Sequence, residues 1–510
     1  MSWHITCASG QTLTALLLYL LAGDPALAEP PPSDPGITLR LGLDSLQPHP
    51  SKLRGGLTLG LLRPMEDGYY LGATIYSAAL GEAGGLYLGG VEWGRAIPLG
   101  GPYFLDASIY LGGGGGAGQV PGDGLSTRAR LGLGRSLGDW GARGWDLMLG
   151  AARLNVRGSA IHASSLELVL QRRFDPGILS ADNQGSPASP VSPVSPRSTR
   201  SLGEPPAELR LQALRPRVAR YHLAGSAAFD ALGIEAEFGL ADSDWLPVLK
   251  TMGAARGNAQ GYADWTVGAR RYAPLGSSGL AAYLDLGLGT GGGGAIASGS
   301  GLLAQAAGGL QWAGSKPWAL QLEAGHMHSQ GRFRSNYLAA LINWQDSGWG
   351  PAPGRAAPDL GPQAWALRAG VSQIKSNARL RQGASVGRLN IETLDLQIER
   401  DIGASAYLLG QTSFAMLGQA GGYQSGFLGV GWRQPVGDWA LNPELALGVA
   451  GGGGVATRGG GVARWQLNLA HRLGPQSQWL VGLGQMRALK PGGMSSPTLT
   501  LGLTQHFVLR

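Results

Sequence analysis

The stretch that decides the fold is residues 94–116, which begin GRAIPLGG and end YLGGGGG. The same order of a basic residue, a proline and a glycine run recurs at residues 270–294 (RRYAPLG to GLGTGGGG) and 432–454 (WRQPVG to LGVAGGGG). A tryptophan, a basic residue and a glycine follow each run at matching offsets: Trp145, Arg153 and Gly158; Trp318, His326 and Gly331; Trp479, Arg487 and Gly492. Self-similarity at a long fixed period marks a repeated structural unit, so the chain is interpreted as three copies of one unit.

Each unit divides into short segments in which apolar and polar residues alternate. In residues 104–111, Leu105 and Ile109 take one face, and Asp106 and Ser108 take the other. Alternation with period two predicts a strand with one apolar and one polar face. The first unit gives eight such candidate strands: 37–44, 57–62, 69–76, 86–93, 104–111, 128–133, 146–154 and 166–174. Three units of this kind predict about 24 strands in all.

The composition favours a membrane barrel. Hydrophobic residues make up 44% of the chain, charged residues only 14%, and glycine accounts for 87 of the 510 residues. No apolar run of about 18 residues follows the N-terminal region, so the sequence predicts no helical membrane span there. Strands of about 8–11 residues suit a tilted crossing of the hydrocarbon layer. The sequence therefore predicts an all-β, antiparallel transmembrane β-barrel.

The chain divides into segments of contrasting composition. The apolar core at 13–22 and the small residues Ala26 and Ala28 predict a signal peptide, residues 1–28, cleaved near Ala28. The only cysteine, Cys7, would leave with it. The rest divides into β-repeat 1 (29–174), a Pro/Ser-rich linker (175–207), β-repeat 2 (208–344), a Gly/Pro-rich linker (345–363) and β-repeat 3 (364–510). The linkers are too polar and proline-rich to form strands.

Two arrangements of the three units fit this pattern. The expected one is a single wide barrel of about 24 strands, because the many glycines on the polar faces, such as Gly42 and Gly150, would fill a narrow lumen poorly. The alternative is three tandem eight-stranded barrels, which the linkers and the aromatic residue at the end of each unit favour.

Three sets of residues are candidates for function. The first is a charged residue pair facing the lumen in each unit: Arg40 with Asp106, Arg210 with Asp285, and Arg368 with Glu444. In a closed unit such pairs would form salt bridges across the lumen, and in a wide barrel they would line a channel. The second is a periplasmic aromatic belt of Trp145, Trp318 and Trp479. The third is a set of basic residues, Arg153, His326 and Arg487, expected at the interface with lipid or lipopolysaccharide phosphates.

The motifs that suggest chemistry are weak. No helical pattern follows the glycine runs, so they are not interpreted as phosphate-binding loops but as places where strands bend. His326, His328 and Ser329 (GHMHSQ) resemble the His-x-Ser element of outer-membrane lipid A 3-O-deacylases, which are eight-stranded barrels. The resemblance implies a lipid-modifying enzyme as a third possibility, but the spacing departs from the element, and no enzyme activity is expected. No metal site, cofactor or nucleic-acid module is expected either.

The C-terminal segment TLGLTQHFVLR (500–510) resembles the last strand of bacterial outer-membrane β-barrel proteins, which the assembly machinery recognises. It departs in ending three residues after Phe507 and in carrying Gln505. The resemblance implies a porin-like protein of the Gram-negative outer membrane, with lipid, lipopolysaccharide and the assembly machinery as partners. A periplasmic partner could dock through the linkers. The expected function is a channel for polar solutes or a secreted polymer, and the alternative is a non-conducting surface or anchoring protein made of plugged small barrels.

Overall fold

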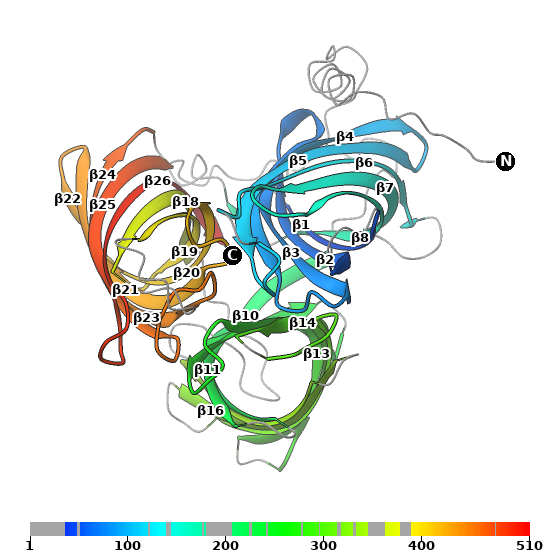
Figure 1. Cartoon of the computed structure of the whole chain (residues 1–510). Helices are drawn as coiled ribbons and strands as arrows, with labels where there is room; N and C mark the ends of the chain where they lie inside the picture. Colours follow the sequence, from blue (N-terminus) through cyan, green and yellow to red (C-terminus); the bar gives the residue numbers. More distant parts are fainter. Residues whose placement is uncertain are drawn as a thin grey trace, which may run out of the picture.

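The computed structural model describes residues 36–47, 52–120, 123–138, 144–175, 178–179, 207–223, 227–240, 243–276, 279–294, 296–313, 318–329, 333–344, 363–377, 389–474 and 476–509. Within them the chain forms three β-barrels that follow one another in the sequence. In Figure 1 the first is blue to cyan, the second is green and the third is yellow to red. Among the described residues, no helix is long and apolar enough to span a membrane. The expected signal peptide and most of both expected linkers lie outside the described residues.

Each barrel has eight main strands. Barrel 1 contains β1 (Ile37–Gln47), β2 (Leu53–Pro64), β3 (Tyr69–Gly81), β4 (Tyr87–Gly100), β5 (Tyr103–Gly115), β6 (Ser126–Ser136), β7 (Trp145–Val156) and β8 (His162–Asp175). Barrel 2 contains β10 (Ala207–Leu223), β11 (Phe229–Leu240), β12 (Leu246–Arg256), β13 (Tyr262–Pro274), β14 (Leu280–Gly293), β15 (Leu302–Ala313), β16 (Trp318–Ser329) and β17 (Arg334–Trp344). Barrel 3 contains β18 (Gln363–Ser376), β19 (Leu389–Asp401), β20 (Ala406–Gly418), β21 (Gln424–Trp432), β23 (Trp439–Gly451), β24 (Gly461–Arg472), β25 (Ser477–Ala488) and β26 (Ser495–Leu509).

Three short elements complete the described chain. A single 3-10 turn, η1 (Glu66–Gly68), joins β2 to β3, and β22 (Gln434–Val436) pairs with the start of β23. The two-residue strand β9 (Ile178–Leu179) pairs with β26 of barrel 3. The last of these falls in the segment 175–207, where no strand was expected.

Each unit closes on itself, which corrects the expectation of one wide barrel. The first strand pairs with the eighth in antiparallel register, from Ile37 opposite Phe174 to Gln47 opposite Ser164 in barrel 1. The same closure joins β10 to β17 and β18 to β26. The structure is therefore three eight-stranded barrels, the arrangement that the sequence offered as the alternative.

The inward-facing glycines explain why the expectation failed. At some of them, large side chains of neighbouring strands lie over the glycine. A Cβ atom on Gly56 would lie 2.2 Å from the ring of Tyr76, and one on Gly431 would lie 2.2 Å from the ring of Tyr407. A missing side chain thus admits an aromatic one. The narrow lumen is filled by tyrosine and arginine side chains that reach across it.

The barrels are apolar outside and polar inside. Large hydrophobic side chains stay exposed on the outer walls, with Leu149, Leu288 and Leu445 each more than 60% exposed. The same strands bury arginine, lysine, aspartate and glutamate side chains in the lumen. A water-soluble barrel has the reverse arrangement, so this pattern is typical of barrels surrounded by lipid.

The two ends of each barrel differ. At one end, here called the terminal end, the first strand begins and the last strand finishes. The other, here called the glycine end, carries the loops after the first, third, fifth and seventh strands, and with them the glycine runs. In barrel 1 the run Gly112–Gly116 closes β5, and Gly114, Gly115 and Gly116 have φ angles between 128° and 146°. Glycine adopts such backbone conformations without strain.

The three barrels pack in a closed ring (Figure 1). The fifth strand of one unit meets the third strand of another in every case: β5 packs on β20, β23 packs on β12, and β14 packs on β3. Each contact is head-to-tail, and three of them close the ring, as in a cyclic trimer. The chain is thus a single-chain counterpart of a three-fold assembly.

The glycine runs lie at these contacts. The backbone N–H of Gly422 in barrel 3 donates to the carbonyl oxygen of Gly114 in barrel 1 (3.0 Å). A Cβ on Gly85 of barrel 1 would lie 2.1 Å from the backbone nitrogen of Gly293 in barrel 2. A Cβ on Gly451 of barrel 3 would lie 2.5 Å from the backbone nitrogen of Gly261 in barrel 2. The runs therefore let the backbones of neighbouring barrels touch, a role that the sequence did not suggest.

The ring predicts a specific cross-link between barrels 2 and 3. A Cβ on Gly253 would lie 3.5 Å from the Cβ of Val449, which is within the range of a disulfide. We expect a Gly253→Cys/Val449→Cys variant to oxidise readily. With a protease site placed in 345–363, the two fragments should stay joined after cleavage and heat denaturation until they are reduced.

The matched control is Leu288→Cys with Val449→Cys, because Leu288 is 63% exposed on the outer wall. This pair should give separate fragments. Separation of the Gly253→Cys/Val449→Cys fragments without reductant would contradict the ring.

Candidate functional site

The lumen of barrel 1 holds a network of ion pairs centred on Arg40. Its guanidinium lies 2.7 Å from the carboxylate of Glu92 and 3.1 Å from that of Asp106. Arg130, from β6, approaches the same two carboxylates at 3.1 and 2.6 Å. Tyr70 donates a hydrogen bond to Asp106 (2.9 Å). Two cations thus share two carboxylates, with all four side chains buried.

A second layer lies nearer the glycine end of the same lumen. Arg128 lies 3.1 Å from both Asp44 and Glu167. Asp44 also accepts hydrogen bonds from the hydroxyl of Tyr76 (3.0 Å) and from the backbone N–H of Gly56 (2.7 Å). The side chains of strands on opposite sides of the barrel therefore meet across the lumen at two levels.

Barrel 2 is filled by a larger network around Arg270, which is fully buried. Its guanidinium contacts four carboxylates: Glu235 at 2.6 Å, Glu237 at 3.2 Å, Asp285 at 2.9 Å and Glu323 at 3.3 Å. The other buried cations complete the network, with Lys250 at 2.7 Å from Asp285, Arg215 at 2.9 Å from Glu237, and Arg217 at 2.6 Å from Glu323. No charge in this network lies without an opposite partner.

The network of barrel 3 is centred on Glu444. Arg368 lies 2.8 Å from Glu444 and also pairs with Glu399. Arg464 reaches Glu444 at 3.3 Å, and Tyr407 donates a hydrogen bond to the same carboxylate (2.8 Å). Serine, threonine and glutamine side chains supply much of the remaining lumen. They line a cavity of about 10 Å³, which is room for roughly one water molecule.

An apolar cluster closes each lumen at the glycine end. In barrel 1 it includes Leu46, Leu86, Val120, Leu154, Val156 and Ile161. In barrel 2 it includes Tyr221, Phe229, Met252, Tyr262, Met327 and Phe333. In barrel 3 it includes Ile374, Ile391, Tyr423, Val455, Met486 and Met494. Apolar packing at one end and ion pairs below it thus occupy the lumen of each barrel.

The structure brings two of the three lumen pairs expected from the sequence together. Arg40 contacts Asp106, and Arg368 contacts Glu444. The side chain of Arg210 lies outside the described residues, and Asp285 pairs with Lys250 and Arg270 instead. Most of the remaining cations and acids of the networks were missed. Their positions in the period-two alternation could have identified them, because they share the inward faces of the strands with the expected lumen pairs.

The basic residues expected at the lipid interface all point outward. Arg153, His326 and Arg487 are exposed on the outer wall, near the glycine end of their barrels. His326 interacts with Asn336 of the adjacent strand, with 2.8 Å between the ring Nδ1 and the amide oxygen. They therefore occupy equivalent places in the three barrels.

The resemblance to deacylases finds no geometric support. His326 and His328 are exposed on the outer wall, whereas Ser329 is 1% exposed and faces the lumen. A serine nucleophile and its histidine base must lie within hydrogen-bond reach of each other. These side chains lie on opposite faces of the same strand.

The tryptophans expected as an aromatic belt lie at the terminal end: Trp145 and Trp318 open the seventh strands of their units, and Trp479 lies two residues after the start of β25. Trp145 stacks with Arg172, whose guanidinium carbon lies 5.1 Å from the ring. Trp479 packs against Trp439, with 5.6 Å between ring centroids. The side chain of Trp318 lies outside the described residues. In the part of the chain that the structure describes, no group of His, Cys, Asp and Glu side chains could hold a metal ion.

Comparisons with known proteins add little to this geometry. No protein-family model matches the chain, and no curated protein matches it. Solved structures that match include OpdQ of Pseudomonas aeruginosa, with 9% identity, 93% of this chain and 98% of that chain covered, and a TM-score of 0.21. They also include the copper transporter OprC, with 11% identity, 93% of this chain and 81% of that chain covered, and a TM-score of 0.30. The KdgM porin matches with 5% identity, 57% of this chain and 98% of that chain covered, and a TM-score of 0.14. At such TM-scores the likeness carries no argument about function.

The lumen network of barrel 1 predicts a large effect for the loss of Arg40. Arg40→Ala leaves Glu92 and Asp106 buried with one cation between them, so we expect the free energy of unfolding to fall by about 3–5 kcal/mol. Adding Asp106→Asn should restore part of the loss, because one buried charge is removed. Urea unfolding in lipid vesicles measures both.

The control is Arg271→Ala, since Arg271 and Asp244 form an exposed pair on another barrel. Its effect should be about 0–1 kcal/mol. Equal effects of the two arginine substitutions would mean that the lumen of barrel 1 is solvated.

Proposed function

We propose that the chain is an integral protein of the Gram-negative outer membrane, with the terminal end of each barrel toward the periplasm. The exposed leucines of the outer walls and the buried charges of the lumens support a lipid environment. The tryptophans at the terminal end suit one membrane interface, and the basic residues near the glycine end suit the other. The signal peptide expected at residues 1–28 agrees with export.

We further propose that the three barrels are non-conducting and that the protein acts as a surface or anchoring element. The observation that carries this proposal is the double closure of every lumen. Buried ion pairs cross it, and an apolar cluster seals its glycine end. A hydrated solute could pass only by separating buried charges from their partners, which is costly. The wide channel expected from the sequence depended on a single barrel of about 24 strands.

A narrow channel through barrel 3 is the second candidate. Within the described part of its lumen, several buried polar atoms have no hydrogen-bond partner, among them both amide atoms of Asn442 and the hydroxyl of Thr504. Unsatisfied buried polar groups are commonly served by water. If water solvated the ion pairs of barrel 3, only its apolar cluster would seal the lumen, and the barrel would conduct whenever that cluster moved.

The remaining expected partners fit the same orientation. Arg153 and Arg487 would contact lipopolysaccharide phosphates at the outer interface, and β26 would present the terminal strand to the assembly machinery. A periplasmic partner would dock at the linkers on the terminal side.

Planar bilayers test the choice between these functions. We expect the purified protein to insert, as checked by heat-modifiable electrophoretic mobility, and to show no stable conductance steps. Met486→Ala/Met494→Ala removes apolar side chains from the closure of barrel 3, and Leu154→Ala is the matched change in barrel 1.

Under the main proposal neither variant conducts. Steps in the Met486→Ala/Met494→Ala variant alone would support the second candidate, because the two ion-pair layers of barrel 1 stay in place. Large steps in the unmodified protein would contradict the non-conducting proposal.

A further inference from the structure

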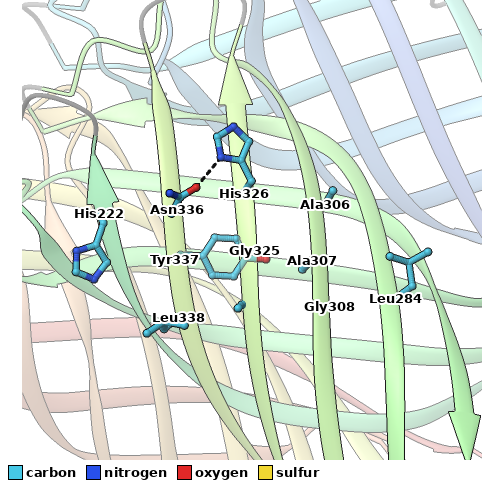
Figure 2. Close-up of a pocket in the computed structure, with 11 residues that line it drawn as sticks. His222, Leu284, Ala306, Ala307, Gly308, Gly325, His326, Asn336, Tyr337 and Leu338 are labelled. Atoms are coloured by element: carbon cyan, nitrogen blue, oxygen red, sulfur yellow. Dashed lines mark hydrogen bonds between the residues drawn. The ribbon is translucent and has the colours of Figure 1, made fainter.

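The outer wall of barrel 2 carries a depression that reaches about 700 Å³ (Figure 2). Its floor is made of small residues on two adjacent strands, with Ala306 and Gly308 on β15 and Ala324 on β16. Leu284 and Leu338 stand on either side, as Figure 2 shows. A depression on this wall faces the acyl chains of the surrounding membrane.

At the floor position of Gly308, the corresponding walls of barrels 1 and 3 carry larger side chains. The strand register aligns the three units, because His326 pairs with Ala306, Arg153 pairs with Ala129, and Arg487 pairs with Ala463. On these sixth strands, the residue two positions after the aligned alanine is Gly308 in barrel 2, Leu131 in barrel 1 and Trp465 in barrel 3.

The eighth strands show the same contrast. Asn336, Ser164 and Ser495 pair with the three aligned basic residues. The residue four positions after Asn336 in barrel 2 is Ala340, whereas the residues four positions after Ser164 and Ser495 are Leu168 in barrel 1 and Leu499 in barrel 3. Gly308 in the floor, and Ala340 on the same outer wall beyond Leu338, therefore distinguish barrel 2 from the other two units, and the depression is not a consequence of the repeat.

A polar row closes the depression toward the glycine end. His222, Asn336 and His326 lie side by side on β10, β17 and β16, since Asn336 is the register partner of both histidines. In the next row toward the glycine end, His328 pairs with Arg334, and both side chains are exposed. Three histidines, an amide and an arginine thus stand at the head of an apolar groove. This arrangement matches an amphiphile with a phosphorylated head and a hydrocarbon tail.

We propose that this groove is a binding site for one molecule of lipid A, with an acyl chain over Ala306, Gly308 and Ala324 and a phosphate against Arg334 and the histidines. The choice of lipid A over a phospholipid rests on the proposed function, because in that orientation the glycine end lies in the outer leaflet. Because the floor carries smaller side chains, an acyl chain can approach the wall of barrel 2 more closely than the walls of the other barrels. Arg153 and Arg487 would contact lipid phosphates transiently, without a binding groove beside them.

Native mass spectrometry of the detergent-solubilised full chain, titrated with purified lipid A, tests the proposal. Gly308→Leu/Ala340→Leu gives barrel 2 the residues that barrel 1 has, and it should weaken binding of the first lipid A by about tenfold or more. Ala151→Leu, on the equivalent wall of barrel 1, is the matched control and should leave binding unchanged. Arg334→Gln should weaken binding while the groove stays open.

The possible outcomes separate this inference from the proposed function. Unchanged lipid A binding in Gly308→Leu/Ala340→Leu would overturn the groove as a site. Equal affinity for phosphatidylglycerol and lipid A would overturn the choice of lipid. Heat-modifiable mobility of each variant shows whether the barrels are folded, and bilayer conductance, which does not depend on the groove, reports separately on the proposed function.

Discussion

The ion pairs inside the barrels are the interaction on which the rest of the structure depends. Arg270 is fully buried and lies within salt-bridge distance of four carboxylates. A buried arginine is tolerable only when its charge and its N–H groups are matched, and those carboxylates come from strands around the lumen. Eight strands bring opposite walls close enough for the side chains to meet. Closure of each unit and pairing of its charges therefore require each other.

Glycine is the complement of these large side chains. Inside the barrels it makes room for aromatic rings, as Gly56 does for Tyr76. Between the barrels the runs at Gly112–Gly116, Gly291–Gly294 and Gly451–Gly454 stand where neighbouring units meet, and there the backbones approach directly. On the outer wall Gly308 opens the groove of barrel 2. One residue type thus serves the lumen, the ring and the lipid surface.

The sequence predicted the parts of the fold that repeat. Period-two alternation and the landmarks of the three units predicted all-β units of eight strands, and the inward positions of Arg40 and Asp106 led to a pair that the structure joins. Closure of each unit was only the alternative expectation, because the inward glycines were interpreted as unfilled space, whereas the tyrosine of a neighbouring strand fills the space at Gly56. The ring and the groove depend on contacts between distant segments, such as Gly114 with Gly422, for which periodicity carries no signal.

The most direct test of independent closure is a cross-link at the seam of barrel 1. Leu43 on β1 and Leu168 on β8 are register partners, and both side chains are exposed on the outer wall. The account predicts that Leu43→Cys/Leu168→Cys forms a disulfide in the membrane-inserted protein, as detected by peptide mass spectrometry. In a single wide barrel, β1 would instead pair with β26. Failure of this cross-link, together with a disulfide between Leu43→Cys and Leu501→Cys, would contradict the account, because Leu501 is the register partner of Val371, the counterpart of Leu43 in barrel 3.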